Sequence, residues 1–229
     1  MTALTATLPI FNSFRPKVAS SRNLSTRTPY SSMTREKKDV YLDEKVWLAQ
    51  ARKGDKAAFG KLIEAYQGPV YNLAYRMLNN SREAEEAAQE AFIRAWTRLA
   101  SYNPNHKFST WMLSITSNYC IDLLRKRRAL LLSIDEPLPN HPALMSEKES
   151  GPEGQAIAAD REATVQKLLQ TLPDEYRQAV VLRYWYEHSY EEIADVMQTS
   201  VSAIKSRLFR ARRLMAKSGS EMGIATAVR

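Results

Sequence analysis

The sequence predicts an all-α protein made of two small helical domains that are joined by a flexible acidic linker. Apolar residues recur every three or four positions through most of the chain, and no segment alternates polar and apolar residues with the period of a strand. Prolines, glycines and acidic residues gather in residues 130–155, without a helical period, and separate two periodic regions. A length of 229 residues leaves room for one or two domains.

Residues 1–41 precede the periodic regions and are predicted to form a disordered basic extension. The segment has no acidic residue before Glu36 and is rich in Ser, Thr, Arg and Pro. This composition also resembles an organellar transit peptide. A third interpretation is that translation starts at Met33, so that residues 1–32 are not translated. We favour a disordered arm or a start at Met33 over targeting.

A helical domain is predicted for residues 42–129, and turn residues end its first two helices. Asp43–Arg52 forms the first helix, which ends at the glycine-containing segment Lys53–Asp55. Ala57–Leu78 forms the second helix, and Gly68–Pro69 marks a kink or a break inside it.

The third and fourth helices of this domain are separated by a polar loop. Asn80 precedes the third helix, and Glu83 stands at the capping-box position of its first turn. A continuous apolar stripe follows at helical spacing: Ala84, Ala87, Ala88, Ala91, Phe92, Ala95, Trp96 and Leu99. After the loop Ser101–Lys107, a fourth helix over Thr110–Arg128 ends in a run of four cations: Arg125, Lys126, Arg127 and Arg128.

Three surfaces of this domain are candidates for binding. Opposite the alanine stripe lies a ridge of hydrogen-bond acceptors around one apolar residue: Glu86, Gln89, Glu90 and Ile93. This pattern suits a protein partner with a basic rim, and a solvated ridge explains it equally well. The loop and the start of the fourth helix combine aromatic and amide side chains with cations, which suits unstacked nucleobases: Tyr102, Asn103, His106, Lys107, Phe108, Thr110 and Trp111. Phe108 and Trp111 also fit the core, which we favour for Trp111. The basic run would hold phosphates, or it is a solvated charge run.

Residues 130–162 are predicted to form the acidic linker and the start of the next helix. They hold seven acidic and two basic groups, whereas cations are in excess on both sides. A second helical domain is predicted for residues 163–216, with helices near Gln155–Leu172 and Asp174–Trp185. Residues 217–229 are predicted to be a disordered tail.

The segment Ser189–Met215 predicts two helices joined by a tight turn. Ser189 and Glu192 have the spacing of a capping box. After the polar break Gln198–Ser200, the apolar residues of the second helix recur on one face: Val201, Ile204, Leu208, Ala211 and Met215. A short helix followed by a basic one is typical of a helix-turn-helix, whose second helix enters the DNA major groove.

The other face of this basic helix carries the candidate DNA-contacting residues: Ser202, Lys205, Ser206, Arg207, Phe209, Arg210 and Arg213. A cation can bond to a guanine edge and Phe can contact a thymine methyl, so we expect Lys205, Ser206, Phe209 and Arg210 to read the duplex. Arg207, Arg212 and Arg213 would mainly contact phosphates. A solvated basic helix in an ordinary bundle is the alternative interpretation.

Composition narrows the class of function. A net charge of +8 favours a polyanionic partner. No apolar run approaches the roughly 18 residues of a membrane span, so a soluble protein is predicted. The single Cys120 excludes an internal disulfide, and with three scattered His residues it makes no recognisable zinc site, so we expect no metal and no cofactor. Carboxylates do not cluster and no activated nucleophile is evident, so we expect no enzyme activity.

Together these segments resemble the sigma-70 family of bacterial RNA polymerase, specifically its extracytoplasmic-function (ECF, group IV) subfamily. Ser81–Trp96 is similar to the family's core-binding segment and Phe108–Arg128 to its promoter-melting and minus-ten segment. Leu172–Arg212 is similar to its minus-thirty-five domain. The order and spacing of these segments over residues 42–216 carry the resemblance, and residues 130–162 are too short for the extra domain of housekeeping sigma factors.

Two positions depart from the family pattern. The usual turn glycine of the helix-turn-helix is Gln198 here, which would cost about 1 kcal/mol if the turn requires a positive φ. The usual pair of aspartates is replaced by Glu83 and Glu86, which keeps the charge and lengthens the reach.

The resemblance implies a cytoplasmic bacterial factor that binds core RNA polymerase and recognises the minus-thirty-five and minus-ten promoter elements. By this resemblance the ridge at Glu86–Ile93 grips the clamp helices of β′, the second domain meets the β flap, and the loop captures flipped non-template bases. The acidic linker would thread the RNA path of the polymerase, and an anti-sigma factor would be a further partner. The alternative is a free-standing helix-turn-helix regulator, which leaves the first domain unexplained.

Overall fold

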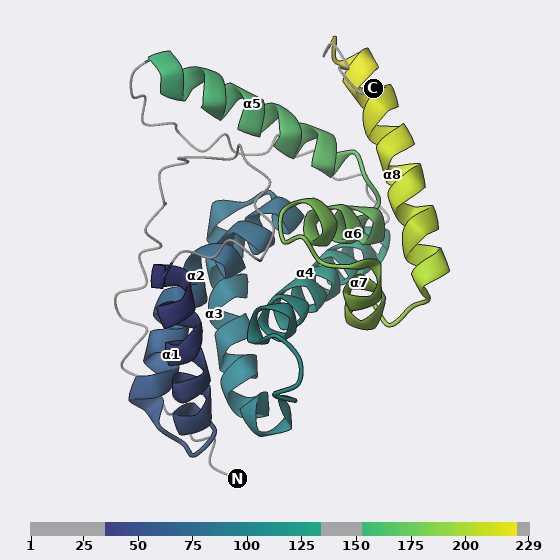
Figure 1. Cartoon of the computed structure of the whole chain (residues 1–229). Coiled ribbons are helices and arrows are strands. Elements are labelled where there is room, and N and C mark those ends of the chain that lie inside the picture. Colours follow the sequence, from purple (N-terminus) through teal and green to yellow (C-terminus); the bar gives the residue numbers. More distant parts are fainter. Residues whose placement is uncertain (1–34, 134–152, 224–229) are drawn as a thin grey trace.

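The computed structural model describes residues 35–133 and 153–223, which fold into helices joined by short turns and loops (Figure 1). No strand occurs within these two ranges, and the predicted all-α fold is confirmed. The expectations for residues 1–34, for most of the acidic linker and for residues 224–229 lie outside the described ranges. No described helix is long and apolar enough to cross a membrane.

The first helix is longer than the sequence predicted. Helix α1 covers Arg35–Ala51, so it begins eight residues before the expected start at Asp43. The prediction that the extension stays disordered up to residue 41 is therefore wrong for its last seven residues. Charged residues of good helix propensity fill this stretch, and without an apolar stripe they gave no periodic signal.

Helix α2 covers Lys56–Leu78 and runs through the position where a kink or break was predicted. Asp55 caps its start, because its carboxylate accepts hydrogen bonds from the amides of Ala57 and Ala58 at 2.8 and 3.2 Å. Pro69 lies inside the helix. Val70 and Leu73 just beyond it are fully buried, and this packing keeps the helix continuous despite the missing amide.

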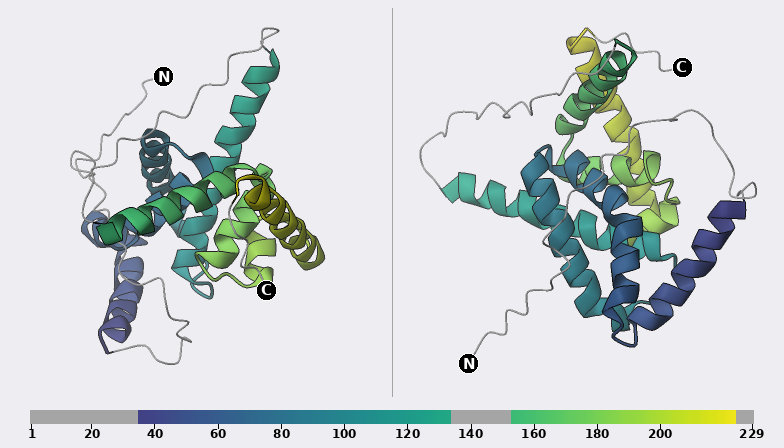
Figure 2. Two further views of the ribbon diagram at one scale, coloured as in Figure 1. Left: turned by 90° about the horizontal axis from the view of Figure 1, so that it is seen from above. Right: turned by 90° about the vertical axis from the view of Figure 1, so that its left-hand side faces the viewer.

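The next two helices complete the first half of the molecule. Helix α3 covers Ser81–Arg98, with Asn80 as its N-cap, and the 3-10 turn η3 covers Leu99–Ser101. All five alanines of the predicted stripe are fully buried, which lets α3 pack closely against α2 and α4. Helix α4 covers Phe108–Ser133, five residues beyond the expected end, and its C-terminal part projects from the bundle in both views of Figure 2.

The second half contains the helix-turn-helix. Helices α5 and α6 cover Glu153–Gln170 and Asp174–Tyr184, and α7 and α8 cover Tyr190–Val196 and Val201–Glu221. The prediction that the tail is disordered from residue 217 is wrong for its first five residues, since α8 continues to Glu221. The capping box of Ser189 and Glu192 is present, and Gln198 in the turn has a φ of 49°, in the left-handed region that its family position predicted.

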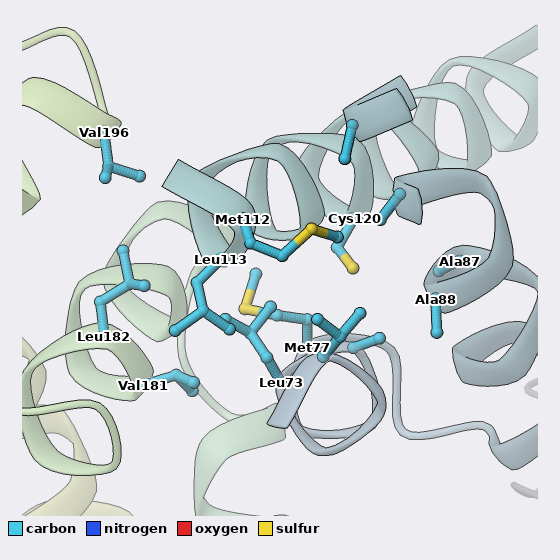
Figure 3. Packing of buried hydrophobic residues seen from close by; sticks show 14 of the residues in the cluster. Leu73, Met77, Ala87, Ala88, Met112, Leu113, Cys120, Val181, Leu182 and Val196 are labelled. Atoms are coloured by element: carbon cyan, nitrogen blue, oxygen red, sulfur yellow. The ribbon is translucent and has the colours of Figure 1, made fainter. Parts of the chain in front are cut away.

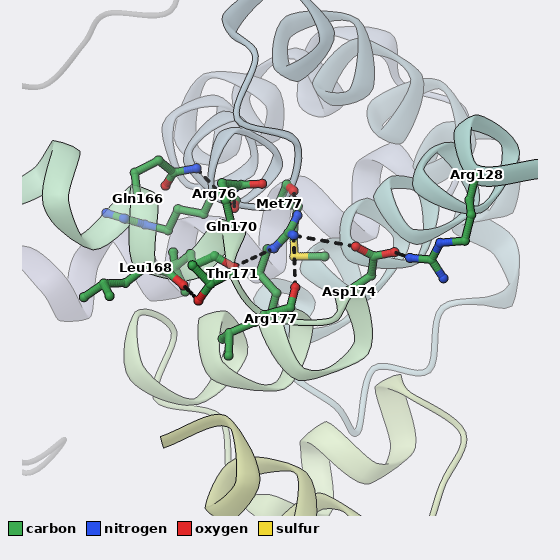
Figure 4. Close-up of polar contacts among 11 residues, drawn as sticks. Arg76, Met77, Arg128, Gln166, Leu168, Gln170, Thr171, Asp174 and Arg177 are labelled. Carbon is green, nitrogen blue, oxygen red and sulfur yellow. Dashed lines mark hydrogen bonds and ion pairs between the residues drawn. The ribbon is translucent and has the colours of Figure 1, made fainter. Parts of the chain in front are cut away.

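The two halves pack against each other around one contiguous hydrophobic core. In Figure 3, Leu73 and Met77 of α2 lie beside Val181 and Leu182 of α6. The buried guanidinium of Arg177 reinforces this junction, because it donates to the carbonyls of Leu169, Leu172 and, across the junction, Met77 (Figure 4). Burial lowers the pKa of Arg177 and nearby Asp174 opposes that shift.

Candidate nucleic-acid and partner interfaces

The loop between η3 and α4 is held closed by its own hydrogen bonds. The hydroxyl of Tyr102 donates to the carbonyl of His106 at 2.6 Å. The side chain of Asn103 accepts from the amide of Asn105 at 3.0 Å, and its carbonyl accepts from the amide of His106 at 3.1 Å. Asn103, His106 and Lys107 are exposed. A loop that is shaped in advance can receive a ligand without a large cost of ordering.

An aromatic cluster lies beneath this loop. Tyr102 and Phe108 are only 5% and 1% exposed, and their ring centroids lie 5.6 Å apart. Trp111 is half-buried and packs against both rings. The sequence suggested that Tyr102 stacks on bases and left Phe108 open between base stacking and the core. In this arrangement both side chains instead support the loop from inside, because their rings are buried in the aromatic cluster.

Six of the predicted minus-ten residues line one cavity of ≈ 380 Å³: Tyr102, Asn103, His106, Lys107, Thr110 and Trp111. Glu192, Asp195 and Val196 of α7 form its opposite wall. The cavity thus lies between the two halves, and carboxylates of the helix-turn-helix face the loop that was expected to meet DNA. Sequence reasoning did not predict these acidic residues in the site, since spacing along a chain gives no information about contacts across some 80 residues.

Glu192 has two functions in this structure. One oxygen accepts from the Ser189 amide at 2.8 Å and completes the cap of α7. The other lies 3.4 Å from the hydroxyl of Thr110 and 3.7 Å from the ammonium of Lys107. Burial alone would raise the pKa of Glu192, but the Ser189 hydrogen bond and the charge of Lys107 outweigh it and lower the pKa. The carboxylate therefore stays charged and attracts the loop.

Further hydrogen bonds fix the middle of α4 to the second half. The side-chain amide of Asn118 donates to the carbonyl of Val196 at 3.3 Å. Gln178 of α6 donates to the hydroxyl of Ser117 at 3.2 Å and to the side chain of Asn118 at 3.1 Å. The direction of Asn118, which the sequence left open, is therefore toward α6 and α7.

The basic run at the end of α4 is paired with carboxylates. Arg125 lies 3.6 Å from Glu175, Arg128 bonds to Asp174 at 2.5 Å, and Arg127 pairs with Glu83 of α3. The Arg side chains remain 45–64% exposed, and exposed pairs of this kind contribute only about 0–1 kcal/mol. Phosphates can therefore replace these carboxylates at small cost.

The recognition face of α8 is open. Ile204, Leu208 and Ala211 bury the opposite face, as the sequence predicted. Six of the candidate DNA-contacting residues are exposed: Ser202, Lys205, Ser206, Phe209, Arg210 and Arg213. Arg207 differs, because it bonds to Glu175 at 2.8 Å and its side chain is only 24% exposed. Arg207 thus lies at the rim of the face, next to α6.

The ridge on α3 lies on the surface of the first half. Ile93 is 43% exposed, which agrees with its predicted position opposite the alanine stripe. Glu86 pairs with Arg82 at 3.1 Å and half-buried Glu90 pairs with Arg94 at 2.7 Å. Gln89 between them is half-buried. The ridge therefore presents one apolar side chain bordered by polar groups.

The single cysteine takes no part in these surfaces. Cys120 is fully buried in the core, and burial raises the pKa of its thiol to about 12. Cys120 is therefore a small apolar core residue rather than a reactive thiol.

Two family descriptions match the chain. Residues 62–130 match sigma-70 region 2, and residues 162–215 match sigma-70 region 4. These ranges contain the loop, the basic run and the ridge in the first case, and the helix-turn-helix in the second.

Curated relatives extend this similarity over most of the chain. The ECF RNA polymerase sigma factor SigW of Bacillus subtilis is 35% identical over 175 residues, which cover 74% of this chain and 93% of SigW. The ECF RNA polymerase sigma-E factor of Escherichia coli K12 is 33% identical over 175 residues, with 75% and 91% covered.

Two solved structures share the fold. CnrH, solved in complex with the cytosolic domain of CnrY, superposes with a TM-score of 0.58 and 24% identity, over 78% of this chain and 98% of CnrH. The sigma factor RpoE of Bartonella quintana, solved with the anti-sigma factor NepR, gives a TM-score of 0.53 and 21% identity, over 69% and 94%.

Proposed function

This chain belongs to the sigma-70 family, in its extracytoplasmic-function branch, and from that membership we propose which promoter element each of its two halves recognises. As an RNA polymerase sigma factor it directs core polymerase to promoters and initiates transcription. It supplies recognition, and the catalysis of RNA synthesis belongs to the polymerase.

Helix α8 reads the minus-thirty-five element as a duplex. The observation that carries this assignment is its open face, where Lys205, Phe209 and Arg210 are exposed while Ile204 and Leu208 anchor the opposite side. A helix docked in the major groove places such side chains against base edges. Arg212 and Arg213 at its flank contact phosphates.

The loop and α4 handle the minus-ten element as a single strand. His106, Lys107 and Thr110 surround a cavity where an unstacked base would fit, with Trp111 at its side. Arg125–Arg128 follow on the same helix and hold the phosphates of the strand. Because Glu192 and Asp195 now face this cavity, α7 must leave the loop before DNA enters, since phosphates and carboxylates repel each other.

The remaining surfaces bind proteins. The ridge around Ile93 and Gln89 contacts the clamp helices of β′, and the second half contacts the β flap, as in the family. The chain acts in the bacterial cytoplasm, where the polymerase is. The complex of the Bartonella quintana sigma factor RpoE with the anti-sigma factor NepR also supports an anti-sigma factor as a partner.

Transcription by core polymerase tests this function directly. Purified chain added to bacterial core polymerase should give initiation at defined sites on a genomic library, mapped by the transcript ends. Gln89→Ala with Ile93→Arg should weaken binding to core at least about tenfold and leave the melting temperature within a degree or two, because Ile93 is exposed and Gln89 is only half-buried. Tight promoter binding by the chain alone, with no association with core, would favour the free-standing regulator.

A further inference from the structure

A second cavity lies on the other side of the minus-ten loop, between the loop and α1. Its volume is ≈ 320 Å³. Leu48 of α1 and Phe108 at the start of α4 contribute apolar surface, and both are buried. Three cations line the cavity: Lys45 and Arg52 from α1, and Lys107 from the loop. An apolar floor with cations around it is suited to a nucleobase that carries its phosphate.

The loop is the common wall of the two cavities. Tyr102, His106 and Lys107 line both of them. Because Tyr102 closes the loop through its bond to the His106 carbonyl, the wall is held in shape between the two spaces. A strand that leaves a base in the cavity facing α7 therefore has to cross only His106 and Lys107 to reach the cavity facing α1.

The charges of the two cavities differ in sign. The cavity facing α7 includes the carboxylates of Glu192 and Asp195. The cavity facing α1 includes one carboxylate, Glu44, against three cations. In the closed arrangement of the two halves, the α1 side is therefore the one that attracts phosphate, and α7 does not line it.

Glu44 gives this cavity a polar group that can distinguish bases. Its carboxylate accepts a hydrogen bond from the hydroxyl of Tyr66 at 2.5 Å, which fixes its position. Burial raises the pKa of Glu44, and the Tyr66 hydrogen bond opposes that shift. An ionised carboxylate only accepts hydrogen bonds, and the exocyclic amino group of cytosine, adenine or guanine offers it two hydrogens, whereas thymine offers only its N3–H. Glu44 therefore favours the bases that carry an amino group.

We propose that the cavity between α1 and the loop is a second single-stranded DNA subsite, which holds the nucleotide neighbouring the flipped minus-ten base and prefers a base with an amino group. Arg52 and Lys45 hold its phosphate, and Glu44 accepts from the amino group. The proposal rests on the proposed sigma function, because only an opened promoter supplies the single strand.

Site-specific photocrosslinking in the holoenzyme tests the position of the strand. A photoreactive phenylalanine analogue replaces exposed Ala49, which lines the α1 cavity alone, or exposed Ser101, which lines the other cavity alone. On a promoter with a mapped start site, both should crosslink the non-template strand, at nucleotides within a few positions of each other. A crosslink from Ser101 with none from Ala49 overturns the subsite and leaves the sigma function intact. Absence of initiation and of both crosslinks is the failure of the sigma function itself.

Matched substitutions test the chemistry. Arg52→Ala should lower the log–log salt slope of open-complex formation by about 0.7, the value for one phosphate of a single strand, whereas Lys53→Ala, which does not line the cavity, should leave it unchanged. Glu44→Gln should reduce the preference for an amino-bearing base over thymine at the Ala49-crosslinked nucleotide by about fivefold or more. Equal effects of Arg52→Ala and Lys53→Ala, or unchanged base preference in Glu44→Gln, contradict the assignment.

Discussion

The two proposed DNA-binding surfaces of this protein differ in how far carboxylates of the same chain cover them. On α8 the side chains that we propose to face the major groove are exposed, and among the residues of this face that the structure describes only Arg207, at its rim, pairs with a carboxylate. On the first half, by contrast, Lys107, Arg125 and Arg128 face carboxylates of the second half. The minus-thirty-five surface is thus ready in the closed arrangement, whereas the minus-ten surface is neutralised by the other half of the same chain.

This difference indicates which step of promoter recognition requires a rearrangement. Duplex DNA can dock on α8 without moving it from its neighbours. Single-stranded DNA has to displace Glu192 from the loop and Asp174 and Glu175 from the basic run. These ion pairs are mostly exposed and individually weak. The buried junction at Arg177 therefore contributes most to holding the two halves together.

Arg177→Ala should have the largest effect, a loss of about 3–5 kcal/mol in the free energy of unfolding. Three carbonyls would lose their donor in a buried site, and the side chain would leave a cavity. Denaturant unfolding followed by circular dichroism measures it. Arg183→Ala is the matched control, because Arg183 of the same helix donates to the His188 carbonyl and lies over the Tyr190 ring, both in the second half, and its loss should cost about 1 kcal/mol.

The shape of that transition tests whether the two halves are one cooperative unit. Because the core is contiguous across the junction, wild-type unfolding should be a single transition. Arg177→Ala should separate it into two, with the second half unfolding first. A variant that unfolds in one step at unchanged stability would show that the junction contributes little, and the contrast between the two surfaces would lose its structural basis.

Arg210→Ala should cost about 1–3 kcal/mol in promoter binding and change the preference at defined upstream base pairs, because its side chain is exposed on the groove-facing side of α8. Start-site mapping with a library randomised in the minus-thirty-five region measures the preference. Arg212→Ala at the flank should weaken all promoters alike. If Arg212→Ala altered base preference and Arg210→Ala did not, the assignment of the two roles would be inverted.

Arg125→Gln combined with Arg128→Gln should weaken all promoters similarly and lower the log–log salt slope by about one to two units, since two phosphate contacts are lost. The substitution also removes the pairs with Glu175 and Asp174, so the closed state should open slightly. Open-complex formation measured against salt concentration gives the slope. Lys217→Gln near the end of α8 is the control, and a change of promoter choice in the α4 variant would contradict its role as a phosphate contact.

Most of the fold could be predicted from the sequence, because local signals mark it. Asn80 and Ser189 cap α3 and α7 as their spacing indicated, and the alanine stripe is buried as predicted. The errors fall where tertiary packing outweighs a local signal, as at Pro69, or where a helix has no apolar stripe, as at the start of α1.

The candidate site was predictable only in part. Periodicity separated the open face of α8 from its buried face, and it placed Ile93 on the surface. It could not show that Tyr102 and Phe108 turn inward, since an aromatic residue in a loop fits a core as well as a base. Nor could it show that Glu192, recognised as a helix cap, also reaches Lys107 and Thr110, because that contact depends on how the two halves pack.

Glu192→Gln should produce the smallest effect and the most direct test of the closed minus-ten surface. Glutamine preserves the capping box of α7 but removes the charge that faces Lys107. Because the side chain is partly exposed, the loss should be only about 0.5–1 kcal/mol, which raises the affinity of the free chain for non-template oligonucleotides about twofold to fivefold. Glu191→Gln, exposed in the same turn, should leave this affinity unchanged.

The influence of Glu192 on the oligonucleotide affinity should depend on pH in a defined direction. The pKa of Glu192 is lowered in the folded protein, so its attraction to the loop is fully present above the ordinary glutamate pKa of 4.5 and is lost as the pH falls through the lower folded value. At neutral pH the wild-type chain is therefore fully held by this contact, and acidification should bring its oligonucleotide affinity toward that of Glu192→Gln. Fluorescence anisotropy between pH 7 and the acid limit of folding measures both chains. If the two curves keep the same separation at every pH, the charge of Glu192 does not hold the loop, and the closed minus-ten surface depends on the hydrogen bonds of Asn118 and Gln178 instead.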